Sequence, residues 1–182
     1  MAALLLAVLA AAAPVAPAAS PEVRANVSAL LNAFDRPVTP EAFAQLGPEG
    51  EAALAEVALS NDFAPRRARA LEVLSVLKTP RAEEVHRAVA ASGDAHWLVR
   101  RAAVLGLGRL LPAERAASEL APFLERDREP AVRAAAAEAL AARAPAQACG
   151  VVRAQAAREL AGNAARFRSA LGACDRAGGA RQ

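Results

Sequence analysis

Two sets of polar residues recur in this 182-residue sequence at one fixed spacing, which is the step from Arg67 to Arg100 and again from Arg100 to Arg133. One set consists of the arginines Arg67, Arg100 and Arg133. The other consists of residues of types that cap helices, Asn61, Asp94 and Asp127. An acidic residue at a helix start can cap that helix and accept hydrogen bonds from an arginine of its own or a neighbouring unit. We therefore interpret the six as a structural ladder. The alternative is that the stacked arginines form a row that binds an anion.

A second group of residues is left as binding candidates once the ladder is set aside. They are Arg66, Arg69, Trp97, Arg101 and Arg109, with Arg153 and Arg158 further along the chain. If the arginines converge on one groove, they can bind an acidic protein segment, a polyanion or membrane phosphate. Trp97 is of a type that anchors bound partners, although packing against the preceding unit is the interpretation we favour. Solvated surface charge is the more ordinary role of such arginines.

Two cysteines, Cys149 and Cys174, are the only ones in the chain, and the midpoint between them falls beside Gly162. An antiparallel helical hairpin hinged there would bring the two thiols together, and an oxidising compartment would join them. The sequence therefore predicts a disulfide, on the condition that the protein is exported. The alternative, a reactive thiol, lacks a paired histidine.

Patterns for catalysis or metal binding are missing from the sequence. His86 and His96 have no cysteine or carboxylate neighbours at ligand spacing. A nucleophile elbow, a phosphate-binding glycine loop and a metal motif are also missing. We predict no catalytic residue, no metal site and no cofactor.

The elements that must position these side chains are helical hairpins, and the best-formed copy lies at Asp94–Leu110. Small and large apolar residues keep the same step as the arginines: Ala70, Ala103 and Ala136, then Leu74, Leu107 and Leu140. A fixed period of about 33 residues with helical patterning is typical of a repeat array. With 55% hydrophobic but only 3% aromatic residues, the core must form where helices approach closely over small side chains. We predict an all-α fold.

These units resemble the HEAT-repeat family, in particular its short bacterial form related to the bilin-lyase repeats. The residues that carry the resemblance have the order acid, Val-Arg, Ala and Leu: Asp94, Val99, Arg100, Ala103 and Leu107, and again Asp127, Val132, Arg133, Ala136 and Leu140. The resemblance implies a right-handed α-solenoid of stacked antiparallel helix pairs. It covers roughly residues 21–160, and it says little about function because such repeats serve many roles.

The chain divides into three expected parts: a signal peptide over residues 1–18, a HEAT-like repeat domain over 19–174 and a disordered tail over 175–182. Within the domain, Ser20-Pro21 and Thr79-Pro80 are expected to begin helices, since a cap residue precedes a proline at each. Gly47-Pro48 is expected to end a short helix before a longer one at Glu51–Leu59, and Gly162-Asn163 to form the last hairpin turn. The first residues combine an apolar run at Leu4–Ala13 with an Ala-Pro-Ala ending, a pattern typical of secretory leaders. We expect export to the periplasm or extracellular space; a retained anchor is the alternative.

Three classes of function follow. We favour a non-enzymatic, monomeric, exported scaffold that binds a protein or peptide on its concave surface, since solenoids present such surfaces. An arginine-rich face that binds a polyanion or a membrane surface is one alternative, although the formal net charge of only +3 and the absence of interleaved aromatics do not favour nucleic acid. The other alternative is a HEAT-like enzyme such as a bilin lyase or DNA glycosylase, which would need a defined acidic and aromatic pocket.

Overall fold

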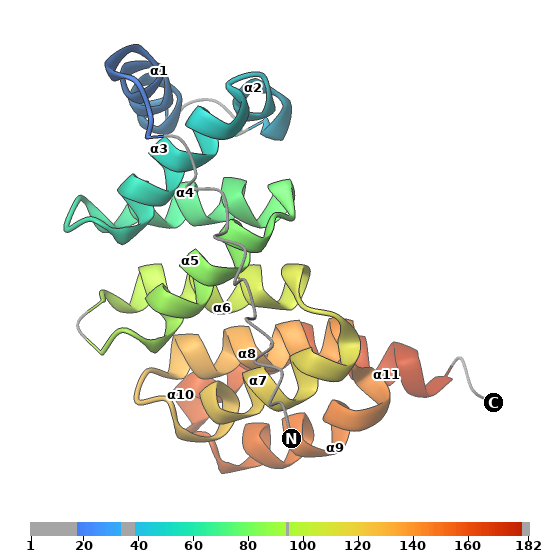
Figure 1. Cartoon of the computed structure of the whole chain (residues 1–182). Coiled ribbons are helices and arrows are strands. Elements are labelled where there is room, and N and C mark those ends of the chain that lie inside the picture. The colour runs from blue at the N-terminus through green and yellow to red at the C-terminus, as the bar shows by residue number, and fades with distance from the viewer. Residues whose placement is uncertain (1–17, 34–38, 94, 180–182) are drawn as a thin grey trace, which may run out of the picture.

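All regular elements in the part of the chain that the structure describes, residues 18–33, 39–93 and 95–179, are helices. Figure 1 shows the computed structural model as a curved stack of antiparallel helices. The helices are α1 (Pro21–Asn32), α2 (Pro40–Ala44), α3 (Gly47–Leu59), α4 (Ala64–Leu77), α5 (Pro80–Ala91), α6 (Trp97–Leu110), α7 (Ala113–Arg126), α8 (Pro130–Arg143), α9 (Pro145–Arg158), α10 (Ala161–Ala164), the 3₁₀ helix η1 (Ala165–Phe167) and α11 (Arg168–Gly179). The predicted all-α solenoid is confirmed.

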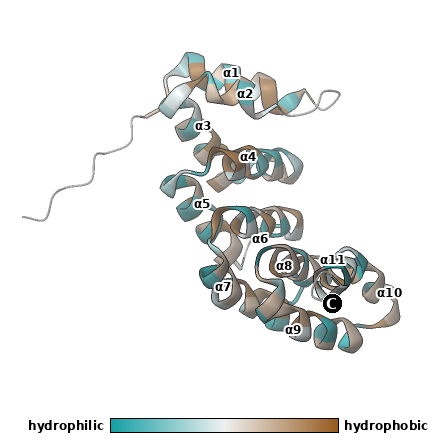
Figure 2. Ribbon diagram, turned by 90° about the vertical axis from the view of Figure 1, so that its right-hand side faces the viewer, coloured by the Kyte–Doolittle hydropathy of each residue, from teal (hydrophilic) through white to brown (hydrophobic). Residues whose placement is uncertain are grey.

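The helices form two rows. Helices α4, α6 and α8 pack against one another along the inner side of the bend, while α3, α5, α7 and α9 lie behind them (Figure 2). At the N-terminal end α1 and α2 pack against α3 and α4, and at the C-terminal end α11 packs against α8 and α9. The inner row therefore forms the floor of a concave surface with a terminal unit at each end.

Helix starts follow the proline and hydroxyl signals in the sequence. The hydroxyl of Ser20 accepts a hydrogen bond from the Val23 amide at 3.4 Å, and that of Thr79 accepts one from the Ala82 amide at 3.1 Å. Each is followed by a proline in the first helical turn, where the missing N–H has no helical partner to lose. These caps fix the starts of α1 and α5 where the sequence predicted them.

Three boundaries differ from the sequence predictions. Gly47-Pro48 does not end a helix but begins α3, with Gly47 at a positive φ of 61°; a proline in the first turn favours a helix start. The last hairpin turn lies at Glu159 and Leu160, and Gly162-Asn163 falls inside α10. The tail expected to be disordered over 175–182 is helical through Gly179, because α11 continues past Cys174, which is 1% exposed and packed in the core. Residues 1–17 of the expected signal peptide and residues 180–182 lie outside the described residues.

The core consists of leucine, valine and alanine side chains at the repeating positions. Ala70, Ala103 and Ala136 are fully buried, and Leu74 and Leu140 are at most 2% exposed. Alanine at the repeated small position lets neighbouring backbones approach, and the leucines fill the space that remains. The buried repeating positions are thus the ones that the sequence period predicted.

Two glycines on α6 mark the closest helix contacts. A Cβ atom at Gly106 would lie 2.1 Å from the His86 Cδ2 atom on α5, and one at Gly108 would lie 2.5 Å from the Ala139 Cβ atom on α8. His86 is fully buried between three helices, and its ring nitrogens lie 2.6 Å from the carbonyl oxygen of Ala82 and 3.0 Å from that of Leu71. Burial lowers the pKa of the His86 imidazole below its ordinary value, against the opposing effect of the two carbonyl groups.

Cys149 on α9 and Cys174 on α11 are at disulfide bonding distance, with sulfur atoms 2.08 Å apart and Cα atoms 5.5 Å apart. The bond closes a segment of 25 residues in sequence separation. In the chain-entropy model, closing a loop of this length stabilises a fold by roughly 3 kcal/mol. The pair therefore fastens the terminal unit to the rest of the stack.

Replacing Gly106 with alanine should destabilise the protein by about 1–3 kcal/mol, because the added methyl group would overlap the buried His86 ring. Urea unfolding followed by circular dichroism measures the change. Gly150→Ala is the matched control, since Gly150 is an exposed helical glycine with open space around it. The control should be neutral or more stable by up to about 1 kcal/mol; equal losses in both variants would contradict the close contact.

Candidate functional site

The inner surface carries a hollow of about 340 Å³ between α4 and α6. It has an apolar floor with charged residues at its sides, and its lining is Pro65, Ala68, Arg69, Glu72, Leu98, Arg101, Ala102, Leu105 and Arg109. A hollow of this size and composition can receive several side chains of a bound molecule.

A second hollow of about 410 Å³ continues the first along the inner row towards α8. The two share Leu105 and Arg109, and the second is lined also by Ser75, Val76, Lys78, Gly108, Glu138, Ala139, Ala142 and Arg143. We call the two adjoining hollows together the inner groove. It crosses α4, α6 and α8, the three helices of the inner row in Figure 2.

The helical repeat explains why these residues face the groove. Leu98, Arg101, Ala102, Leu105 and Arg109 follow one another on α6 at steps of one, three or four residues, which places them on one helix face. The positions one period earlier on α4 are Pro65, Ala68, Arg69, Glu72 and Val76, all of which line the groove as well. The repeat therefore presents the same helix face in successive units.

Three of the predicted binding residues meet in the groove: Arg69, Arg101 and Arg109. The Arg69 Nη2 atom donates to the carbonyl oxygen of Ala33 at 3.1 Å, and the Arg109 Nη1 atom donates to the Ser75 hydroxyl at 3.1 Å. Arg101 is partly buried and makes no hydrogen bond or ion pair within the part of the chain that the structure describes. None of the N–H groups of its guanidinium therefore has a partner among the described residues, and all of them are available to a ligand.

The other four predicted binding residues, Arg66, Trp97, Arg153 and Arg158, do not line the inner groove. Arg153 pairs with Asp175 at 3.0 Å, and Arg158 is the last residue of α9. Arg66 is held by the Asp62 carboxylate at 2.6 Å and by the Ser28 hydroxyl at 2.9 Å, so it connects α4 to α1. Trp97 is 41% exposed at the start of α6, with its ring 5.5 Å from that of His96, and it does not line the groove. Neither Arg66 nor Trp97 therefore contributes to the lining of the inner groove.

The arginines of the expected ladder each make structural contacts, but with more varied partners than the repeat predicted. Arg100 pairs with the Asp127 carboxylate of the next unit, and their side chains are 8% and 3% exposed. Arg133 instead reaches the Glu159 carboxylate at 2.5 and 2.6 Å and the Asp127 carbonyl oxygen at 2.7 Å. Arg67 donates to the Ala58 carbonyl oxygen at 3.1 Å.

The acid and amide side of the ladder is less regular than the arginine side. Asn61 is exposed and accepts none of these hydrogen bonds from the described arginines, and Asp94 lies outside the described residues. Each arginine of the ladder nonetheless donates hydrogen bonds within the protein: Arg67, Arg100 and Arg133. They do not form a free anion-binding row.

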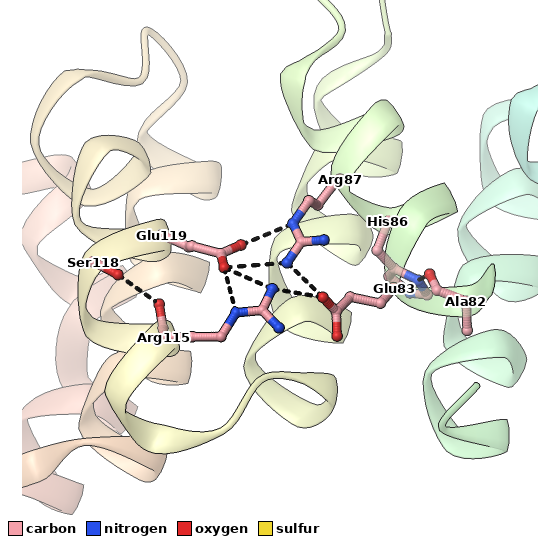
Figure 3. A network of polar contacts seen from close by, with 7 residues as sticks. All are labelled: Ala82, Glu83, His86, Arg87, Arg115, Ser118 and Glu119. Carbon is pink, nitrogen blue, oxygen red and sulfur yellow. Dashed lines mark hydrogen bonds and ion pairs between the residues drawn. The ribbon is translucent and has the colours of Figure 1, made fainter. Parts of the chain in front are cut away.

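The outer surface differs from the inner groove because its charges neutralise one another. Figure 3 shows Glu83 and Arg87 of α5 beside Arg115 and Glu119 of α7. The Arg87 Nε atom lies 2.9 Å from Glu119, while Arg115 donates to Glu83 at 2.7 Å and to Glu119 at 2.9 Å. The hydrogen bond to Glu119 is the largest of several effects that raise the pKa of the Arg87 guanidinium. Two arginines and two glutamates thus join neighbouring units without leaving a net charge.

Neither a metal centre nor a membrane span is found in the described ranges. No group of three or more histidine, cysteine, aspartate or glutamate side chains there is arranged to hold a metal ion. No helix among those residues has both the length and the apolar character needed to cross a bilayer.

Sequence reasoning missed the apolar part of the site, namely Ala68, Leu98, Ala102 and Leu105. It also missed Lys78 and Arg143 at the far hollow. Residue type does not separate the two kinds of position. The buried column that begins at Leu74 is leucine in each unit, but the buried column of Leu71, Val104 and Ala137 changes as the groove positions do.

The sequence model for HEAT repeats matches residues 51–141, half of the chain, and includes the inner helices that form the groove. With the stacked helix pairs and the repeating Val-Arg and Ala columns, this match places the protein in the HEAT-repeat family. No curated protein and no solved structure matches the chain.

Acid should weaken the stack at the Arg133–Glu159 pair. The hydrogen bond from Arg133 lowers the pKa of Glu159 below its ordinary value near 4.5, so the folded state favours the ionised carboxylate. This contribution is fully present above pH 4.5 and is lost as the pH falls through the lowered pKa. The free energy of unfolding of Glu159→Gln should be about 2 kcal/mol lower at neutral pH and should fall less on acidification.

Urea titrations across the acid range measure both effects. Glu125→Gln is the control, because Glu125 is exposed and has no ion pair with any described residue. An acid dependence in Glu159→Gln as steep as that of the wild type would show that this pair does not carry the effect.

Proposed function

We propose that this protein is a non-enzymatic interaction scaffold that binds a protein or peptide segment in the inner groove. The observation that carries the proposal is the groove itself, an apolar floor of Ala68, Leu98, Ala102 and Leu105 exposed on the concave side between arginines. HEAT repeats are helical repeat scaffolds that commonly mediate protein interactions, and stacked repeats create extended concave binding surfaces.

The contrast between the two surfaces supports the inner side as the binding side. On the outer side, Glu83, Arg87, Arg115 and Glu119 bind one another across units. On the inner side, Arg101 has no partner among the described residues, and the partly exposed side chains of Leu98 and Leu105 line the same hollow. These groups are available to a ligand.

We further propose that the scaffold acts in an exported, oxidising compartment. The Cys149–Cys174 pair at bonding distance supports this proposal, because such bonds persist where thiols are not kept reduced. The secretory pattern of the first residues points the same way. A monomer is the simplest state for a stack that has an irregular unit at each end.

A photo-reactive amino acid in place of Leu105 should crosslink the protein to a bound polypeptide in the native host, because Leu105 lines both hollows. The same group in place of Glu84, an exposed residue on α5, is the control and should give no matching product. Adding Ala102→Glu to the Leu105 variant should remove the product by placing a charge on the groove floor. Crosslinking of equal strength at both positions would contradict groove binding.

Export is tested by the intact mass of the protein recovered from the host, measured before and after reduction. We expect a chain that lacks residues 1–18 and gains the mass of two hydrogens on reduction, because the disulfide opens. Cys149→Ser is the control and should show no gain. A full-length chain with reduced cysteines would contradict both export and the disulfide.

A further inference from the structure

We propose that the groove selects an acidic polypeptide segment, in which an aliphatic side chain is flanked by aspartate or glutamate. This inference rests on the proposed function and specifies the partner's chemistry. It follows from the excess positive charge, the unpartnered Arg101 and the apolar floor of the same surface.

The lining of the inner groove has an excess of positive charge. Its basic residues are Arg69, Lys78, Arg101, Arg109 and Arg143, whereas its acidic residues are Glu72 and Glu138. Like charges gathered in a concave surface raise the local potential and attract the opposite charge. On the outer surface, by contrast, the Glu83, Arg87, Arg115 and Glu119 network balances two charges of each sign. The excess is thus a property of the groove.

Arg101 is the central recognition residue of the proposal. It lies on α6 between the apolar Leu98 and Leu105 and has no intramolecular partner in the described part of the chain. A guanidinium group presents a planar fork of N–H donors that matches a carboxylate in a bidentate arrangement. Arg109 lines both hollows and donates through Nη1 to Ser75, and its other donors have no partner among the described residues.

The floor of the groove selects a polypeptide over other polyanions. Ala68, Leu98, Ala102 and Leu105 lie among the arginines, and burying an aliphatic side chain on them contributes about 25 cal/mol for each Å² removed from water. A sulfated sugar has no such side chain. Single-stranded nucleic acid uses aromatic platforms, and no described aromatic residue lines either hollow. A membrane surface does not fit the inside of the bend in Figure 2.

The test is a selection of random short peptides on the immobilised full chain in low-salt buffer, repeated with variants of groove and outer-row arginines. Arg101→Glu reverses the central charge in the groove, and Arg126→Glu reverses an exposed charge at the end of α7 on the outer row. Thermal melts establish that both variants fold as the wild type does. Arg109→Gln, a neutral change at the junction of the two hollows, serves as a second groove variant.

We expect the peptides that bind wild type to be enriched in aspartate and glutamate next to leucine, isoleucine or valine. Synthetic copies should bind Arg101→Glu about tenfold or more weakly, Arg109→Gln more weakly than wild type, and Arg126→Glu unchanged. Replacing their acids with asparagine or glutamine should give a similar loss, and affinity should fall as salt rises.

Different failures identify different errors. Selected peptides that show no acidic enrichment, but whose binding is weakened by Arg101→Glu or Arg109→Gln, would overturn the acidic specificity and leave the proposed groove function intact. An absence of any peptide sensitive to the groove variants would overturn both. Binding of a heparin fragment that is stronger than that of the selected peptides, and is lost in Arg101→Glu, would overturn the polypeptide assignment in favour of a sugar polyanion.

Discussion

The close approach of α6 to its neighbours is the constraint on which this solenoid depends. Gly106 lies against the buried His86 ring, and Gly108 lies against Ala139 of α8. A methyl group at either position would overlap atoms of the adjacent helix. Because the chain has few aromatic side chains to fill wide gaps, its helices have to approach until alanine, leucine and valine fill the space. The curved inner row follows from that approach.

Polar contacts then fix how each unit sits on the next. His86 connects α5 to the carbonyl oxygen of Leu71 on α4, Arg100 pairs with Asp127, and Arg133 pairs with Glu159. These groups are mostly buried, and the hydrogen bonds that they make offset much of the free-energy cost of burying a charge or an imidazole. The contacts therefore specify the register between units, while apolar packing supplies most of the stability. A more exposed set of ion pairs also connects neighbouring units on the outer side, and it consists of Glu83, Arg87, Arg115 and Glu119.

The groove is available because these interactions cover its lining only in part. Leu98, Arg101 and Leu105 on the inner face of α6 are partly buried and line the hollow. On α8 the equivalent positions Ala134 and Ala135 are 8% and 2% exposed, and that helix also packs against α11 and η1. The terminal unit, fastened through Cys149 and Cys174, therefore lies at the end of the open part of the surface. The surface that we propose to bind a ligand is thus confined mainly to α4, α6 and the edge of α8.

The sequence by itself determined the all-α repeat, most helix starts, the buried columns and the pairing of the two cysteines. These features depend on local signals and on a fixed period: a proline after a hydroxyl residue begins a helix, and residues one period apart take equivalent places in the stack. The sequence also named Arg69, Arg101 and Arg109, three residues that line the groove.

Only the tertiary structure decided which arginines are free and where the apolar floor lies. Arg66 and Arg101 occupy helices of the same row, yet Arg66 is held by Asp62 and Ser28 while Arg101 faces the groove. Arg133 likewise pairs with Glu159 because of the way the last unit folds back on α8 and α9. The continuation of α11 through Gly179 depends on the same packing. A period predicts equivalent positions along the chain, but the neighbours of a side chain depend on the curvature and the ends of the stack, which packing between units sets.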